Sequence, residues 1–205
     1  MAAGGRAGTA LERVEVTSRA ALRAWLEANH VRTESVWLVT HKKAAGEMHV
    51  PYDAVVEEAL CFGWVDSLPR KLDAARTMLL LSPRKPGSAW SAANKARVEG
   101  LAAAGLLAAP GRAKIEAAKA DGAWTRLDGV ERLEVPADLA AALAALPPAA
   151  ENFAAFPRSA RRGILEWILQ AKRPETRTKR IEETARLAAE NVRANQFRQP
   201  ARGGA

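Results

Sequence analysis

Residues 63–85 read GWVDSLPRKLDAARTMLLLSPRK, and this stretch decides the fold class. It contains two segments with strand composition, GWVDSLPRKLD and ARTMLLLSPRK, and the second is an almost continuous apolar run. Such a run is typical of a buried strand. Another strand is indicated upstream at Val36–Thr40. After it, the segment KAAGE with Gly46 predicts a hairpin turn that would place His41 opposite His49.

Helices are predicted before, between and after these strands along the sequence. Ser18 is a suitable N-cap for a helix over residues 18–29, in which apolar side chains recur on one face. Pro51 opens a second helix, since proline is favoured in the first turn. A third helix is expected to begin at Ser88 or Ser91. The mixture of strands and helices predicts an α+β fold.

The domain organisation follows from where the strands stop. We expect an α+β domain over residues 16–130 and an all-helical domain over residues 131–197, where proline stands at or beside each predicted helix start. Residues 1–15 and 198–205 are rich in small residues and are predicted to be flexible tails.

Composition limits the class of protein. The chain has 205 residues, of which 48% are apolar, so it can bury a real core. Its single cysteine, Cys61, excludes an internal disulfide and indicates a reducing compartment. No segment has the shape of a signal peptide, and no apolar stretch approaches the roughly 20 residues of a membrane span. We therefore expect a cytoplasmic protein without a membrane span.

The formal net charge is +8, and it is concentrated in two regions. Residues 157–198 hold eleven Lys/Arg against five Asp/Glu, and residues 66–97 hold seven against two. Two basic regions indicate an anionic partner, such as an anionic small molecule, an acidic protein surface or nucleic acid. The alternative is an arginine-rich but merely solvated surface.

The segment SPRKPGSAWSAANK, residues 82–95, has the composition of an anion site. It places two cations, a glycine and two serines just before a helix start, where unpaired backbone N–H groups favour negative charge. Nearby residues could add an orienting carboxylate and a further cation. The predicted binding residues here are Asp66, Arg70, Arg84, Lys85, Ser88, Trp90 and Asn94, with Asp66 orienting the cations. A capped helix with a hydrated basic loop is the alternative.

A second set of cations lies in the helical part. Arg173, Arg177 and Arg180 recur at spacings of four and three, so they share one side of a helix. We expect this stripe to join the loop at residues 82–95 and complete a two-part anion site. A stripe of solvated arginines is the alternative.

Motifs for catalysis and metal binding were sought and not found. There is no G-x-S-x-G, H-E-x-x-H or C-x-x-C motif, and no base stands close in sequence to Cys61. His41 and His49 are at most half of a metal site. The sequence therefore predicts no cofactor and no metal, and an enzyme is less expected than a binding protein.

Several sequence segments resemble the YdeI/OmpD-associated, or bacteriocin-protection, family, and the resemblance extends from about residue 16 to residue 195. The segments are WLEANH, ALCFGWVDSLPRKLD, SPRKPGSAWSAANKARVEGL, AKADGAW and ILEWILQAKRPETRTKRI. This resemblance implies a front domain with a YjbR/CyaY-like fold, in which helices cover one face of a small antiparallel sheet. It also implies that the helical part is the short domain named for OmpD association and bacteriocin protection.

The resemblance further implies a role in resistance to cationic antimicrobial peptides and in envelope stress, with an envelope porin as a possible partner. Frataxin-like relatives bind iron through an acidic ridge, but residues 18–29 contain Glu27 as their only acid, so iron binding is not carried over. The function expected is non-enzymatic binding of an anion or a protein partner. Two alternatives stay open: nucleic-acid binding by the basic C-terminal helices, and an enzyme acting on a phosphorylated or carboxylated small molecule.

Overall fold

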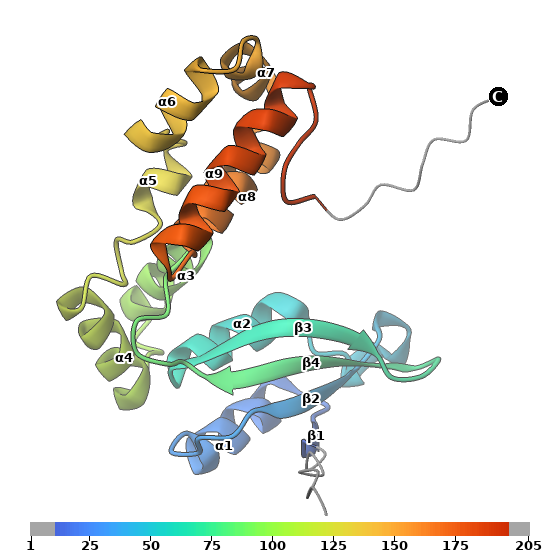
Figure 1. Cartoon of the computed structure of the whole chain (residues 1–205). Coiled ribbons are helices and arrows are strands. Elements are labelled where there is room, and N and C mark those ends of the chain that lie inside the picture. The colour runs from blue at the N-terminus through green and yellow to red at the C-terminus, as the bar shows by residue number, and fades with distance from the viewer. Residues whose placement is uncertain (1–10, 197–205) are drawn as a thin grey trace, which may run out of the picture. The chain divides into compact units, whose positions relative to one another are not determined.

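The computed structural model describes residues 11–196 and divides the chain between Thr125 and Arg126 into two compact units (Figure 1). The boundary expected from the sequence lies between residues 130 and 131, where the structure has a short helix. The C-terminal tail predicted at 198–205, and the first ten residues of the tail predicted at 1–15, lie outside the described residues.

The N-terminal unit contains a four-stranded sheet and four α-helices within its described residues. Its elements are β1 (Arg13–Glu15), α1 (Arg19–Asn29), β2 (Val36–His41), the 3-10 helix η1 (Lys43–Met48), α2 (Tyr52–Cys61), β3 (Trp64–Lys71), β4 (Arg76–Pro83), α3 (Ala92–Ala103) and α4 (Ala109–Ala120). The predicted α+β class is confirmed.

The strand order is β1-β2-β4-β3, and the sheet is mixed. β4 pairs antiparallel with β2 and with β3, whereas β1 pairs parallel with β2. The expectation of a purely antiparallel sheet is corrected here, because α1 connects β1 to β2 as a crossover and so makes their directions the same. Residues 13–15 were assigned to a tail, since three residues are too few to show a strand pattern.

The predicted hairpin after β2 is wrong. Residues 43–48 form η1, and β2 pairs with β4, so that His41 lies opposite Arg76 and not opposite His49. Gly46 adopts a left-handed φ of 61° inside this segment, but no apolar strand follows it before Pro51. The chain folds back as a tight helical turn and continues directly into α2.

One face of the sheet is covered by α1 and α2, as the family resemblance implies and as Figure 1 shows. Leu22 and Leu26 of α1 belong to the same core cluster as Leu38 and Leu81 of the sheet. Since alternate residues of a strand face opposite ways, Met78 of β4 points to the other face. The helix-covered face is therefore the one that builds the core.

The end of α2 is packed tightly against α4. A Cβ atom added to Gly111 of α4 would lie 2.2 Å from the carbonyl oxygen of Cys61, so only glycine allows this approach. Cys61 is completely buried, and burial raises the pKa of its thiol. This agrees with the interpretation of Cys61 as a small buried apolar residue.

The C-terminal unit is helical throughout its described residues, as predicted. Its elements are α5 (Asp128–Glu131), α6 (Ala137–Ala144), α7 (Ala149–Ala155), α8 (Arg158–Leu169) and α9 (Pro174–Ala189). The core of this unit contains Ile164 and Ile168 of α8 together with Ile181 and Ala185 of α9. Spacings of three and four residues place each of these pairs on one face of its helix.

Candidate ligand-binding site

Arg84, the central cation of the predicted anion site, is turned into the protein. It is only 4% exposed, and its guanidinium carbon lies 3.8 Å from the centre of the Trp90 ring. Its Nη1 donates to the carbonyl oxygen of Ala89 at 3.0 Å, and burial lowers its pKa to about 10. The Arg84 side chain thus stabilises the loop to which it belongs.

The amide donors predicted for an anion already have partners within the chain. Ser91, and not Ser88, caps α3 by accepting from the backbone N–H of Asn94 at 3.3 Å. The backbone N–H of Gly87 donates to a carboxylate oxygen of Asp121 at 3.0 Å. The Ser91 hydroxyl and the Asp121 carboxylate therefore occupy positions in which the sequence interpretation placed a bound anion.

A hollow of about 60 Å³ remains beside this loop. It is lined by Arg84 and Trp90, the exposed Lys85, the partly buried Ser88, Lys114 and Asp121 among others. Arg84 Nε and Trp90 Nε1 are both buried without a hydrogen-bond partner in the described part of the chain. A small anion at this loop stays a prediction, and the hollow is too small for a larger ligand.

Asp66 and Arg70 lie on opposite faces of β3. Asp66 accepts a hydrogen bond from the Tyr52 hydroxyl at 2.6 Å, and neither Arg70 nor Arg84 forms an ion pair with it in the described residues. The guanidinium of Arg70 instead lies 4.8 Å from the centre of the Trp37 ring. An irregularity of the strand between Asp66 and residue 69 changes its register, which simple alternation could not reveal.

The arginines predicted in the helical part belong to the other unit. Arg177 forms a bidentate ion pair with Asp138, in which Nε and Nη2 donate to the two carboxylate oxygens at 2.7 and 2.9 Å. This pair lowers the pKa of the Asp138 carboxyl. The guanidinium of Arg180 lies 4.9 Å from the centre of the Trp167 ring. Arg173 precedes α9 and is exposed. Convergence of this stripe with the loop at residues 82–95 stays a prediction.

A much larger pocket, which sequence reasoning did not find, lies in the N-terminal unit. Its volume is about 550 Å³, and it is formed where β2, β3 and β4 meet η1 and the start of α2. It is lined by Thr40, His41, Lys42, Lys43, His49, Val50, Tyr52, Val55, Asp66, Ser67, Pro69, Thr77, Met78 and Leu79. We call it the large pocket.

One end of the large pocket carries hydrogen-bond acceptors. The Tyr52 hydroxyl donates to Asp66, and this bond raises the pKa of Tyr52 to about 12, because loss of the phenolic proton would leave two negative charges side by side. The phenolic oxygen keeps its lone pairs, and the carboxylate keeps a second oxygen. We call Asp66 and Tyr52 the acceptor end.

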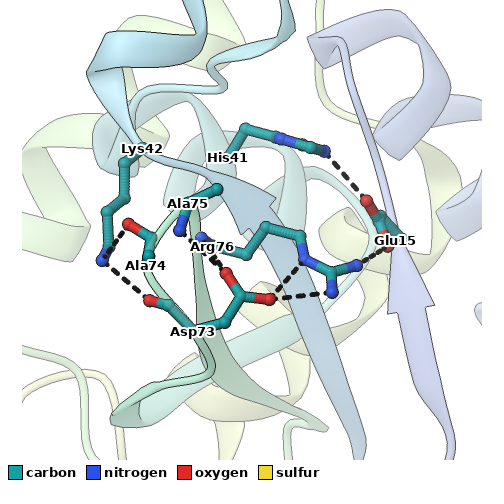
Figure 2. A network of polar contacts seen from close by, with 7 residues as sticks. All are labelled: Glu15, His41, Lys42, Asp73, Ala74, Ala75 and Arg76. Atoms are coloured by element: carbon teal, nitrogen blue, oxygen red, sulfur yellow. Dashed lines mark hydrogen bonds and ion pairs between the residues drawn. The ribbon is translucent and has the colours of Figure 1, made fainter.

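The opposite end carries lysines, and Figure 2 shows how one of them is held. Lys42 Nζ donates to the carbonyl oxygens of Asp73 and Ala74 at 2.9 and 2.8 Å. Arg76 pairs with both Asp73 and Glu15, and so occupies the neighbouring carboxylates. Within the described residues, no carboxylate pairs with Lys42.

Lys43 adds a second positive charge beside Lys42. It is exposed, and it forms no ion pair in the described residues. We call Lys42 and Lys43 the lysine end of the large pocket.

The histidines near the lysine end have defined hydrogen-bonding roles. His41 Nε2 donates to Glu15 at 2.9 Å, since an ionised carboxylate can only accept. His49 Nδ1 donates to the carbonyl oxygen of His41 at 2.7 Å, since a carbonyl oxygen can likewise only accept. The remaining nitrogen of a neutral His49 is therefore an acceptor. His49 lines the large pocket, so this nitrogen can accept from a ligand there.

Two family models match different parts of the chain. Residues 14–114, which contain the large pocket, match a model described as "Domain of unknown function (DUF8412)". Residues 132–191 match the model "Bacteriocin-protection, YdeI or OmpD-Associated". This bacteriocin-protection region contains the Asp138–Arg177 pair and Arg180. A YjbR/CyaY-like front domain is not among the matches and stays a prediction. No curated protein and no solved structure was found to match the chain.

Residues 11–196 contain neither a metal-binding cluster nor a membrane-spanning helix. Nowhere in this range do three or more His, Cys, Asp or Glu side chains gather as they would around a metal ion. The helices in this range are also too short or too polar for any of them to span a bilayer.

Proposed function

We propose that this chain is a non-enzymatic binding protein that contributes to protection against bacteriocins or antimicrobial peptides. The match of residues 132–191 supports the protective role, and the name of that family model suggests an envelope protein as a partner of the C-terminal unit. The N-terminal unit supplies the ligand site. Its ligand carries at least one negatively charged group, in keeping with the net charge of +8.

The single observation that carries this proposal is the large pocket. Its 550 Å³ lies within the range of roughly 300–1,000 Å³ that small-molecule sites occupy. Apolar side chains such as Val50, Val55 and Leu79 line it together with polar side chains, and Asp66 and the two lysines stand at its ends. This combination is typical of a site that binds an apolar body and recognises its ends.

The lysine end is the better place for the negative group of the ligand. Lys42 is held by two carbonyl oxygens and Lys43 is exposed, so their charges are not neutralised by a paired carboxylate. At the loop of residues 84–91, by contrast, Asp121 already occupies an amide donor and the space is small. The anion site is therefore proposed at the large pocket.

Nucleic-acid binding is not favoured. Phosphate contacts need basic side chains that are free to neutralise the backbone. Arg177 is engaged by Asp138, and Arg180 donates to the carbonyl oxygen of Trp167 while it stacks on that ring. Two of the three predicted arginines are therefore committed within the C-terminal unit.

A complementation experiment tests the function. A strain that lacks the gene is expected to become more sensitive to a bacteriocin or a cationic antimicrobial peptide, and the wild-type gene to restore resistance. Ser67→Trp would fill the large pocket from the exposed edge strand and is expected not to restore it. Val31→Trp is the matched control, because Val31 is 78% exposed and does not line the large pocket.

Two results would contradict the proposed function. One is unchanged sensitivity of the strain without the gene. The other is full protection by Ser67→Trp, provided that circular dichroism and thermal unfolding show both tryptophan variants folded to the same extent.

A further inference from the structure

The two ends of the large pocket have opposite hydrogen-bonding character. At the acceptor end, the Tyr52 hydroxyl donates its only hydrogen to the Asp66 carboxylate, so both groups can only accept from a ligand. At the lysine end, Lys42 and Lys43 can only donate. A ligand that satisfies both ends therefore carries a donor group at one end and an anionic group at the other.

The sheet register gives the separation of the two ends. Asp66 pairs with Leu81 of β4, and Thr40, which also lines the large pocket, pairs with Thr77. These two partners are four residues apart on one strand, which corresponds to about 13 Å at about 3.4 Å per residue. Lys42 follows Thr40 by two residues and lies further along, so a ligand that reaches it spans about 13–20 Å.

A pocket of 550 Å³ that is this long is a narrow channel. Its ligand is therefore extended and not compact. An extended polypeptide covers about 3.3–3.6 Å per residue, so about four to six residues would bridge the two ends. Such a chain also has the required termini, an ammonium group and a carboxylate.

The middle of the channel favours a polypeptide over a plain hydrocarbon chain. Asp66 pairs with Leu81 and Pro69 pairs with Leu79, so Ser67 and Leu68 together oppose the single residue Leu80. The ladder between β3 and β4 is interrupted at this point, where Ser67 lines the large pocket. Thr40 and Thr77 also line the pocket, and the Thr77 hydroxyl, which donates to the carbonyl oxygen of Arg70 at 2.9 Å, keeps lone pairs that can accept from a peptide N–H.

We infer that the large pocket binds a short apolar peptide of four to six residues with free termini. Its N-terminal ammonium lies at the acceptor end, against Asp66 and Tyr52, and its C-terminal carboxylate lies at the lysine end. This inference rests on the proposed function, because it names the ligand of the same pocket.

The test is a binding titration of the full chain by isothermal calorimetry with the pentapeptide Ala-Val-Ala-Leu-Ala. Three forms are compared: with free termini, with an acetylated N-terminus, and with an amidated C-terminus. Each modification is expected to weaken binding about tenfold, because each removes a charge-assisted hydrogen bond. A hydrocarbon amino acid of similar length, 12-aminododecanoic acid, is expected to bind more weakly than the free peptide.

Protein variants assign each terminus to its end of the pocket. Asp66→Asn is expected to weaken the free peptide about tenfold and to leave the acetylated peptide unchanged. The double variant Lys42→Gln/Lys43→Gln is expected to weaken the free peptide and to leave the amidated peptide unchanged. Lys71→Gln is the control for charge alone, since Lys71 is exposed and does not line the large pocket.

Equal binding of the three peptide forms, or no binding of any of them, overturns the inference. So does binding of the hydrocarbon amino acid as tight as that of the peptide. These results are separate from the complementation experiment: if Ser67→Trp abolishes protection while no peptide binds, the ligand class is wrong and the proposed function stands. Thermal unfolding detects a variant that has lost its fold. In that case the comparison of the three peptide forms on the wild-type chain still tests the inference.

Discussion

Glu58 is buried between α1 and α2 with only 2% of its surface exposed. It accepts from Arg19 Nε at 2.6 Å and from Arg23 Nη1 at 2.9 Å, so one carboxylate joins two arginines of α1 to α2. A buried charge is tolerated only when it is paired and hydrogen-bonded, and these two partners meet that condition. The neighbouring Glu57 also pairs with Arg19 but is considerably more exposed.

Replacing Glu58 tests whether this contact stabilises the N-terminal unit. Glu58→Gln keeps the shape of the side chain and removes its charge, and we expect it to lower the free energy of unfolding by about 1–3 kcal/mol, the usual worth of hydrogen bonds to a charged group. Glu57→Gln is the matched control and should cost less than about 1 kcal/mol. Urea unfolding measures both. Equal effects of the two variants would contradict a special role for Glu58.

At the scale of the elements, the approach of α4 to the end of α2 depends on one glycine. Gly111→Ala is expected to lower the free energy of unfolding by about 1–3 kcal/mol, because its Cβ would lie 2.2 Å from the backbone carbonyl oxygen of Cys61 and the helices would have to separate. Gly100→Ala in α3 is the control, since no atom lies within 4 Å of its added Cβ. It should raise stability by about 0.5–1 kcal/mol. Thermal unfolding distinguishes these opposite signs.

Elements with strong local signals could be predicted from the sequence. The run of leucines identified β4, and Ser18 was expected as a cap and does accept from the backbone N–H of Ala21 at 3.1 Å. β1 could not be predicted, because its three residues become a strand only by pairing with β2. The hairpin expected around Gly46 failed for the same reason: pairing of β2 with β4 is a tertiary preference that local turn residues do not reveal.

The candidate site was predictable only in fragments. Asp66 was expected to orient Arg70 and Arg84, but Arg70 stacks on Trp37 and the buried Arg84 stacks on Trp90, and these ring contacts arise only in the folded chain. The large pocket has no motif, since its walls come from three strands, η1 and α2. Tyr52 acquires its role only because α2 starts beside β3. Such a site follows from the fold and not from residue spacing.

At the scale of the whole molecule, each unit has carboxyls whose pKa is lowered by arginine, so acid should destabilise both. The hydrogen bond from His41, together with Arg76, holds the pKa of Glu15 low, and Arg177 lowers the pKa of Asp138 from its ordinary value of 3.8. A carboxyl with a lowered folded-state pKa stabilises the fold above its unfolded-state pKa. That contribution is lost as the pH falls through the folded-state value.

Asp138→Asn tests this in the C-terminal unit. At pH 7 we expect the variant to be less stable than the wild type by less than about 1 kcal/mol, because the Asp138 side chain is half exposed and solvent screens the pair. As the pH falls below 3.8 and through the lowered pKa of Asp138, the difference should shrink and disappear, since wild-type Asp138 is then protonated as well. Fluorescence of Trp167, the only tryptophan after residue 125, can follow unfolding of this unit if the tryptophans before it are replaced by phenylalanine. A difference between variant and wild type that persisted at low pH would mean that Asp138 stabilises α6 through its backbone contacts and not through its charge, because its carboxyl also accepts from the N–H of Leu139.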